Sequence, residues 1–161
     1  MVLTAMVVGR VRVSKSHLYK PPFDSSCMQK TRVILDTNFA MIPGQFRVDI
    51  YTEFARILNF PYELCIFKAT LVELQKLAKS NGKDGAAAKL ALVLIKQQNL
   101  KILPNSFKNN GVEEHYTDAI IVAESTPRDI VCTQDKALKR ALKDNNVAII
   151  TLQSQKRLGL S

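Results

Sequence analysis

The sequence lacks the residue patterns of disulfide-stabilised domains and of structural zinc sites. It contains 3 cysteines in 161 residues, namely Cys27, Cys65 and Cys132, and no two of them form a Cys-x-x-Cys pair. His17 and His115 are the 2 histidines that could complete a zinc site, so the composition argues against structural zinc. The odd number of cysteines and their apolar neighbours favour buried, free thiols in a reducing compartment.

Long apolar runs are also absent. No run approaches the ~20 residues that a membrane-spanning helix needs, so we expect no membrane segment. The first apolar stretch precedes Arg10, Arg12 and Lys15, which reverses the order found in a secretory signal. We therefore expect a cytoplasmic protein. A chain of this length with 47% hydrophobic residues can bury a core without disulfides or a structural metal.

Acidic residues are scarce relative to basic ones. The chain carries 23 lysines and arginines against 14 aspartates and glutamates, which gives a formal net charge of +9. An excess of this size favours a polyanionic partner, and nucleic acid is the first candidate. The alternative is a generic solubilising surface, because the sign of the charge names no substrate by itself.

Short apolar runs typical of buried strands alternate along the chain with apolar residues at helical spacing. We predict strands over residues 32–35, 64–67, 100–103, 129–133 and 147–152. Helices are predicted over residues 46–58, 71–78, 86–98, 116–124 and 135–143, after a turn at 43–44. This alternation predicts an α/β fold in which helices cover both faces of a parallel sheet.

Residues 1–30 differ in composition from the rest of the chain. Asp24 is their single acidic residue, and two prolines follow Lys20, so we interpret them as a basic N-terminal extension and linker. Residues 31–155 contain all of the predicted strands and helices and form one expected domain. Residues 156–161 are interpreted as a short C-terminal tail.

Four acidic residues stand at predicted strand ends or in the adjoining helices. Asp36 closes the first strand, Glu73 lies one turn into the helix after the second strand, and Asp135 follows the 129–133 strand. Asp118 stands near the start of the helix that leads to that strand. Taken singly, each could be a helix cap or a solvated side chain. Ligands of open parallel sheets bind at the carboxyl ends of the strands, so we expect the four carboxylates to meet there.

Carboxylates that meet at one sheet edge repel one another unless a cation lies between them. Oxygen ligands suit hard divalent cations such as Mg²⁺ or Mn²⁺, which bind few protein groups and complete their shell with water or phosphate. Beside a basic surface, such a site predicts metal-assisted hydrolysis of phosphodiester bonds.

Four short motifs contain these acidic residues. They are Val33-Ile-Leu-Asp36-Thr-Asn38-Phe, Leu71-Val-Glu73-Leu-Gln-Lys-Leu, Tyr116-Thr-Asp118-Ala-Ile-Ile, and Thr133-Gln-Asp135 with Leu138-Lys-Arg140. In order, spacing and sheet position they resemble the PIN-domain nucleases, over residues 31–153. The chain is most similar to stand-alone archaeal PIN proteins and to the PIN subunit of the eukaryotic small-subunit processome, and more distantly to VapC toxins. Residues 1–30 match no part of the family.

The resemblance implies a three-layer α/β/α sandwich whose central parallel sheet has the strand order 3-2-1-4-5. It implies a site at the end of the central strand, where the matched acidic positions bind Mg²⁺ or Mn²⁺ and cleave RNA to leave 5′-phosphate and 3′-hydroxyl ends. We expect RNA as the main partner. An antitoxin, a ribosome-assembly partner and a second copy of the chain in a homodimer are further candidates.

Each motif residue receives an expected role. The aspartates are assigned to the metal, directly or through water: Asp36, Asp118 and Asp135. Glu73 is either a further ligand or the group that orients the attacking water. Asn38 and Thr133 are expected to hold Asp36 and Asp135 in position, because outer partners fix the orientation of ligands. His115 could act as a general base, although a histidine in front of a helix is more often uninvolved.

A basic stripe on the predicted helix 135–143 is the candidate RNA-binding surface. Its residues are spaced i, i+3, i+4 and i+7: Lys136, Lys139, Arg140 and Lys143. The opposite face, which we expect to be buried, carries Ala137, Leu138, Ala141 and Leu142. The alternative is an ordinary solvated helix face. The aromatic residues that could stack on unpaired bases are Phe39, Phe107 and Tyr116.

These features predict a divalent-metal-dependent endoribonuclease that acts in rRNA or other RNA processing, or as a toxin-type ribonuclease. The alternative is a non-catalytic RNA-binding subunit of a ribonucleoprotein assembly that retains the fold. A Rossmann-type small-molecule protein is disfavoured, because the first strand ends in Asp-Thr-Asn and not in a glycine-rich turn that would cradle a phosphate.

The basic stripe generates the first testable prediction. Lys139→Glu combined with Arg140→Glu should weaken RNA binding and flatten the dependence of log affinity on log salt concentration. Each lost phosphate contact lowers the magnitude of that slope by roughly 0.7–0.9. Fluorescence anisotropy with labelled RNA at several salt concentrations measures the slope. An unchanged slope would return the stripe to the solvated-face interpretation.

Overall fold

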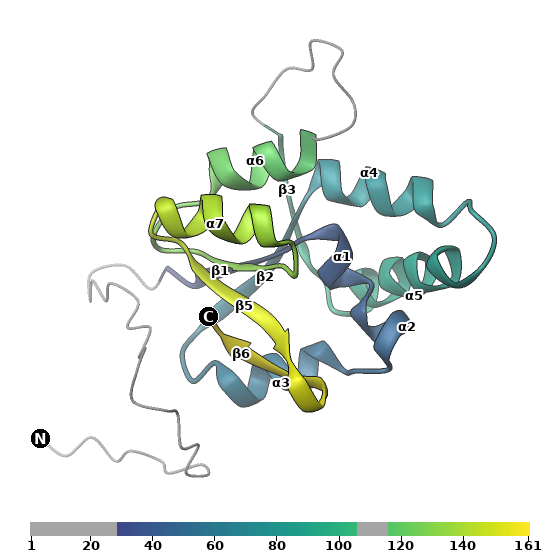
Figure 1. Cartoon of the computed structure of the whole chain (residues 1–161), viewed down its shortest axis with the longest axis horizontal. Coiled ribbons are helices and arrows are strands. Elements are labelled where there is room, and N and C mark those ends of the chain that lie inside the picture. The colour runs from purple at the N-terminus through teal and green to yellow at the C-terminus, as the bar shows by residue number, and fades with distance from the viewer. Residues whose placement is uncertain (1–28, 106–115) are drawn as a thin grey trace, which may run out of the picture.

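The computed structural model describes residues 29–105 and 116–161, which form one six-stranded sheet with helices on both faces (Figure 1). The strands are β1 (Thr31–Leu35), β2 (Tyr62–Phe67), β3 (Lys101–Leu103), β4 (Ile130–Cys132), β5 (Ala148–Gln153) and β6 (Arg157–Leu160). Their order is β3-β2-β1-β4-β5-β6. The first five are parallel, and β6 pairs antiparallel with β5. The predicted order 3-2-1-4-5 is therefore confirmed and extended by one strand.

Seven described helices accompany the sheet. They are α1 (Thr37–Ala40), α2 (Ile42–Phe46), α3 (Ile50–Ile57), α4 (Lys68–Leu77), α5 (Lys83–Gln97), α6 (Tyr116–Glu124) and α7 (Lys136–Asp144). A short 3₁₀ turn, Ser154–Lys156, links β5 to β6. None of the described helices is long and apolar enough to cross a membrane.

The apolar side chains of β1, β2, β4 and β5 alternate between two cores, one on each face of the sheet. Val33 and Leu35 of β1 belong to the core that α1, α2, α3 and α5 cover. Ile34 belongs to the second core, beneath α6 and α7. Figure 1 shows these helices on opposite sides of the strands, with α4 beside α5 and close to α6. The predicted three-layer α/β/α arrangement is confirmed.

The central strand β1 lies where the strand order reverses, because β2 pairs on one side of it and β4 on the other. Leu35 and Cys132, the last residues of β1 and β4, are register partners. The next residue, Asp36, donates its backbone N–H to the carbonyl of Cys132 at 3.0 Å. In sheets of this kind the ligand site lies at the reversal, outside the carboxyl ends of the strands. The fold thus places Asp36 at the expected position of a site.

The segment between β1 and β2 differs from the prediction. Residues 43–44, predicted as a turn, lie inside α2, where Pro43 occupies the first turn and therefore removes no intrahelical hydrogen bond. A Cβ on Gly44 would stand 2.6 Å from the Cα of Ala87, so glycine is needed for the close approach of α2 to α5. The left-handed Arg47 (φ 55°) ends α2, and Asp49 caps α3. The predicted helix 46–58 is therefore shortened to α3, and α2 occupies the residues that were predicted as a turn.

The interpretation of the C-terminal residues from the sequence also needs correction. Residues 156–161, interpreted from the sequence as a tail, contain β6 at one edge of the sheet. Leu158 is buried, its N–H donates to Glu53 Oε2 at 3.0 Å, and its carbonyl accepts from Arg56 Nη2 at 3.0 Å. Glu53 and Arg56 both belong to α3, so this helix holds the last strand by its backbone. One buried residue in a four-residue strand leaves too weak a pattern to be recognised in the sequence.

The cysteines of the described chain behave as predicted. Cys65 and Cys132 are free and buried, in β2 and β4. Burial raises the pKa of the Cys65 thiol to about 11, and that of Cys132 is also raised by burial. Both are therefore held as neutral thiols, which do not act as nucleophiles or metal ligands. Cys27 lies outside the described residues.

Candidate active site

Asp36 is a buried carboxylate at the carboxyl end of the central strand. Asp36 is 3% exposed, and both oxygens of its carboxylate accept hydrogen bonds. Oδ1 accepts from the backbone N–H of Thr37 at 2.7 Å, which makes Asp36 the N-cap of α1. Oδ2 accepts from Oγ1 of Thr133, the residue that follows β4, at 2.9 Å. Two neighbouring strand ends thus fix the orientation of one carboxylate.

The environment of Asp36 disfavours its charge. Loss of solvent on burial is the main cause that raises its pKa, and the negative charges of Asp118 and Glu73 raise it further. The hydrogen bonds from Thr133 and Thr37 stabilise the ionised form and oppose this rise. The balance raises the pKa of Asp36 from its ordinary 3.8 to about 6. Asp36 therefore lies in the field of two other carboxylates.

Glu73 and Asp118 reach this region from two different helices. Glu73 is an exposed residue of α4, and its Oε2 accepts a hydrogen bond from Oγ1 of Thr37 at 2.9 Å. Asp118 is half-buried in the first turn of α6. The structure thus brings Glu73 and Asp118 near Asp36 from two helices that are far apart in the sequence, whereas the prediction was that Asp135 meets them as well.

A second buried carboxylate shows how this chain normally compensates such a charge. Asp129 is 3% exposed at the start of β4, and Arg32 donates to both of its oxygens, from Nε at 2.8 Å and from Nη2 at 2.6 Å. Within residues 29–105 and 116–161, the ion pairs do not include Asp36 or Glu73. The described part of the chain therefore supplies a cation to the aspartate at the amino end of the sheet, and none to Asp36 or Glu73 at the other end.

Asp135 is placed differently from the other three. It is the N-cap of α7, and its Oδ1 accepts from the backbone N–H of Leu138 at 2.7 Å. Its own N–H donates to Thr133 Oγ1 at 3.1 Å, and its charge is not among those that shift the pKa of Asp36. One of the two carboxylate oxygens of Asp135 therefore acts as a helix cap, as the alternative interpretation from the sequence proposed. A role of Asp135 at a metal stays a prediction.

The two residues predicted to position the aspartates, Thr133 and Asn38, are placed differently in the structure. Thr133 is fully buried and contacts both aspartates, since its hydroxyl donates to Asp36 and accepts from the N–H of Asp135. Asn38 is exposed on α1, and the hydrogen bonds to Asp36 come from Thr37 and Thr133 instead. Sequence reasoning missed Thr37, which contacts both Asp36 and Glu73. Its position directly after the strand-ending aspartate was the one available signal.

The basic stripe lies on α7, directly after Asp135. Lys136, Arg140 and Lys143 are exposed and Lys139 is half-buried, while Leu138 and Leu142 are buried. The opposite face is less buried than expected, because Ala137 is exposed and Ala141 half-buried. These two alanines lie beside a groove and do not pack into the core.

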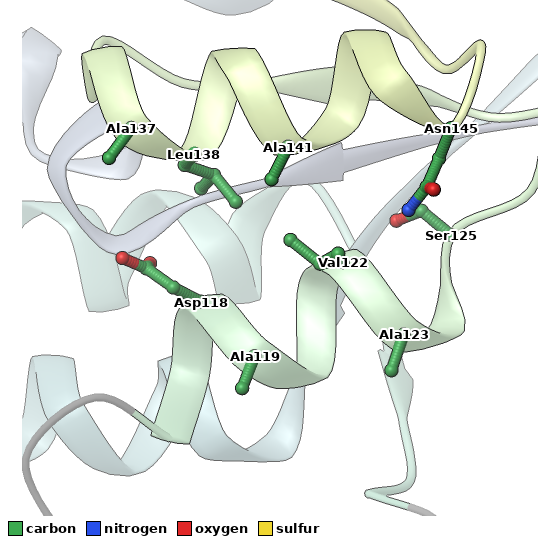
Figure 2. Close-up of a pocket in the computed structure, with 9 residues that line it drawn as sticks. All are labelled: Asp118, Ala119, Val122, Ala123, Ser125, Ala137, Leu138, Ala141 and Asn145. Atoms are coloured by element: carbon green, nitrogen blue, oxygen red, sulfur yellow. The ribbon is translucent and has the colours of Figure 1, made fainter.

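That groove runs between α6 and α7 and has a volume of about 590 Å³. Figure 2 shows Asp118 at one end of it and Ser125 and Asn145 at the other, with small apolar side chains between them. The groove therefore begins at Asp118 and continues away from it along α6.

The candidate stacking residues are mostly placed elsewhere. Phe39 is fully buried and stacks on Phe54 with 6.1 Å between ring centroids, so it is a packing residue and not a surface for bases. Tyr116 is half-buried against the core beneath α6 and α7. Phe107 and His115 lie outside the described residues.

Preformed metal cages are not found in the part of the chain that the structure describes. There, no group of three or more histidine, cysteine, aspartate or glutamate side chains is arranged to hold a metal ion. The charges of Asp118 and Glu73 act on Asp36, but the three carboxylates do not form such a group. This arrangement matches the habit of Mg²⁺, which takes one or two protein carboxylates and completes its shell with water and phosphate.

Comparison with known proteins relates this geometry to a family. A family model described as PIN like domain matches residues 33–155. The chain is 31% identical over 130 residues to ribonuclease VapC4 of Methanocaldococcus jannaschii, which corresponds to 78% of this chain and 92% of that protein. Among solved structures, the PIN domain endonuclease Utp24 matches with a TM-score of 0.66 at 25% identity, over 81% of this chain and 90% of that one. The fold is shared with a VapBC2 structure from Rickettsia felis, at a TM-score of 0.50 and 18% identity, over 76% of this chain and 100% of that one.

The raised pKa of Asp36 makes the stability of the metal-free protein depend on pH. The folded state holds the proton of Asp36 more tightly than the unfolded chain does, so stability is lost as the pH rises from about 4 to about 6. Relative to Asp36→Asn, the unfolding free energy of the wild type in EDTA should fall by about 2 kcal/mol between pH 4 and pH 7. Urea unfolding at several pH values measures the difference.

Asp49 supplies a control of opposite sign. Hydrogen bonds from Thr52 lower the pKa of this exposed carboxylate, so its contribution to stability is lost as the pH falls. Relative to Asp49→Asn, the wild type should therefore gain stability as the pH rises. A pH-independent difference between the wild type and Asp36→Asn would show that Asp36 ionises as freely in the folded state as in the unfolded chain.

Proposed function

The chain belongs to the PIN-like domain family, and on that premise we propose that it is an endoribonuclease that hydrolyses RNA phosphodiester bonds with the help of Mg²⁺ or Mn²⁺. The observation that carries this proposal is the approach of Glu73 and Asp118 to the buried Asp36 at the carboxyl end of the central strand, where burial and then the charges of these two residues raise the pKa of Asp36. The names of two relatives, a ribonuclease and a PIN domain endonuclease, support the reaction class.

The donor set fits a hard divalent cation. Carboxylate oxygens are the ligands that Mg²⁺ and Mn²⁺ prefer. Among the described residues, no ion pair reaches Asp36 or Glu73, whereas Asp129 receives Arg32 as a basic partner. Asp36, Asp118 and Glu73 would hold the ion, with Asp135 reaching it directly or through water. Such an ion lowers the pKa of a bound water and stabilises the charge that develops on the phosphate.

The chain's own residues supply orientation and substrate binding. Thr133 and the N–H of Thr37 hold the Asp36 carboxylate in one orientation, so that it need not reorganise during the reaction. The basic stripe on α7 lies next to Asp135 and would bind the phosphates of the RNA on either side of the scissile bond. The net charge of +9 over the whole chain attracts the polyanionic RNA to the protein.

Two biological roles are candidates: RNA processing, and the activity of a toxin-type ribonuclease. The resemblance to VapC proteins favours an antitoxin as partner, and the similarity to Utp24 favours a processing role, with a ribosome-assembly partner. We place the protein in the cytoplasm, where its free cysteines stay reduced, with RNA as substrate and a homodimer as an oligomeric state to be tested. A small antitoxin-like reading frame beside the gene would separate the two roles in favour of the toxin.

One observation favours a second candidate function. One oxygen of Asp135 is used to cap α7, where it accepts from the backbone N–H of Leu138. A chain that has kept the fold as a non-catalytic RNA-binding subunit would show the same feature. The basic stripe would serve this function unchanged.

Substitution of the aspartates separates the two functions. Asp36→Asn and Asp118→Asn should each abolish Mn²⁺-dependent cleavage of a labelled single-stranded RNA while changing RNA affinity by no more than a few fold, because neither side chain belongs to the basic stripe. Asp84→Asn is a matched control, since Asp84 is an exposed aspartate at the start of α5. Cleavage is followed by gel and binding by anisotropy.

Two outcomes would contradict the proposal. Cleavage at the wild-type rate by either variant, after contaminating nucleases are excluded, would remove that aspartate from the reaction. A wild-type protein that binds RNA tightly and does not cleave it in Mg²⁺ or Mn²⁺ would establish the non-catalytic function instead.

A further inference from the structure

We propose that Thr37 is a positioning residue of the carboxylate site, which fixes Glu73 beside Asp36 and thereby sets the affinity of the site for a divalent cation. This inference rests on the proposed function and adds to it a residue that acts through Glu73. It starts from a geometric fact: Thr37 directs two separate donors at two different carboxylates.

The position of Thr37 is fixed by the fold. It is the first residue of α1, directly after Asp36, and it is 3% exposed. Its backbone N–H donates to Asp36 Oδ1 at 2.7 Å, and its carbonyl accepts from the N–H of Met41 at 3.3 Å. A β-branched side chain in a helix has few allowed rotamers, and burial restricts them further. The hydroxyl of Thr37 is therefore held at a defined place beside the end of β1.

Glu73 needs such a contact, because nothing in its own helix fixes its carboxylate. It is an exposed residue of α4 with a long side chain, and the charge of Asp36 repels it. The hydroxyl of Thr37 donates to Oε2 of Glu73 at 2.9 Å. A hydrogen bond to a charged acceptor is stronger than one between neutral groups. It selects the rotamers of Glu73 that point toward Asp36.

The direction of this hydrogen bond makes the inference testable. An ionised carboxylate can only accept, and the threonine hydroxyl has a single hydrogen to donate. Thr37→Val removes that donor while keeping the size and branching of the side chain. Water can replace the lost donor at the exposed Glu73, so the folded state pays little for the change. The position of Glu73 is lost, and with it part of the preorganised site.

The experiment compares variants with the wild type by calorimetric titration of RNA-free protein with Mn²⁺, and by kcat and KM for cleavage of a labelled RNA. Thr37→Val should bind Mn²⁺ about 10-fold to 100-fold more weakly, as is typical when an outer partner of a metal ligand is removed. Its kcat at a fixed Mn²⁺ concentration should fall, with KM for RNA unchanged. Thr37→Ser keeps the hydroxyl and should restore wild-type Mn²⁺ affinity.

Thr70 supplies a matched control. It is a fully buried threonine one turn before Glu73, and its Oγ1 has no hydrogen-bond partner among the described residues. Thr70→Val should leave Mn²⁺ affinity and cleavage unchanged, because no bond to a carboxylate is removed. Thr37→Val combined with Glu73→Gln should bind Mn²⁺ no more weakly than Glu73→Gln alone, if Thr37 acts through Glu73.

The outcomes distinguish this inference from the proposed function. A wild-type protein that binds Mn²⁺ or cleaves RNA, together with a Thr37→Val variant of equal Mn²⁺ affinity, overturns the positioning role alone. Additive losses in the double variant also overturn it, because Thr37 would then act independently of Glu73. A wild-type protein that neither binds Mn²⁺ nor cleaves RNA overturns both.

Discussion

The burial of one carboxylate at the carboxyl end of β1 constrains the structure around it. Asp36 is 3% exposed, and a buried carboxylate is costly unless hydrogen bonds or a cation compensate it. Thr133, after β4, and Thr37, in α1, supply the hydrogen bonds, but the pKa of Asp36 still rises to about 6. The position of these groups depends on the pairing of β1 with β4, so the fold itself holds the site in an unfavourable electrostatic state.

The distribution of charge in the chain indicates that the unfavourable environment of Asp36 serves a function. Asp129 is equally buried at the amino end of the sheet, and the chain neutralises it with the bidentate Arg32. The same chain has a net charge of +9 and places four cations on α7, yet none of the described ion pairs reaches Asp36. An acidic site left open beside a basic surface is suited to an external cation and a phosphate backbone. Sites that break local stability rules in this way are often functional.

The sheet and its carboxylates could be predicted because their signals are local and redundant. Buried apolar runs marked β1 to β5, and the acidic residues that follow them stood at predictable strand ends. Features that depend on single contacts across the fold left no such pattern. Gly44 is needed only because α2 approaches Ala87, and Thr37 is distinguished only by Glu73, 36 residues further along the chain. The last strand, β6, depends on backbone contacts with α3 that no periodicity records.

The convergence of the carboxylates is tested most directly by thermal melts of the wild type and Asp118→Asn, each in EDTA and in millimolar Mn²⁺. If Asp118 shares a cleft with Asp36 and Glu73, the variant melts at a higher temperature than the wild type in EDTA, because one repelling charge is gone. Mn²⁺ should stabilise the wild type by about 2.7 kcal/mol at a hundredfold excess over Kd, and the variant clearly less. A variant that is less stable than the wild type in EDTA and equally stabilised by Mn²⁺ would contradict the shared site.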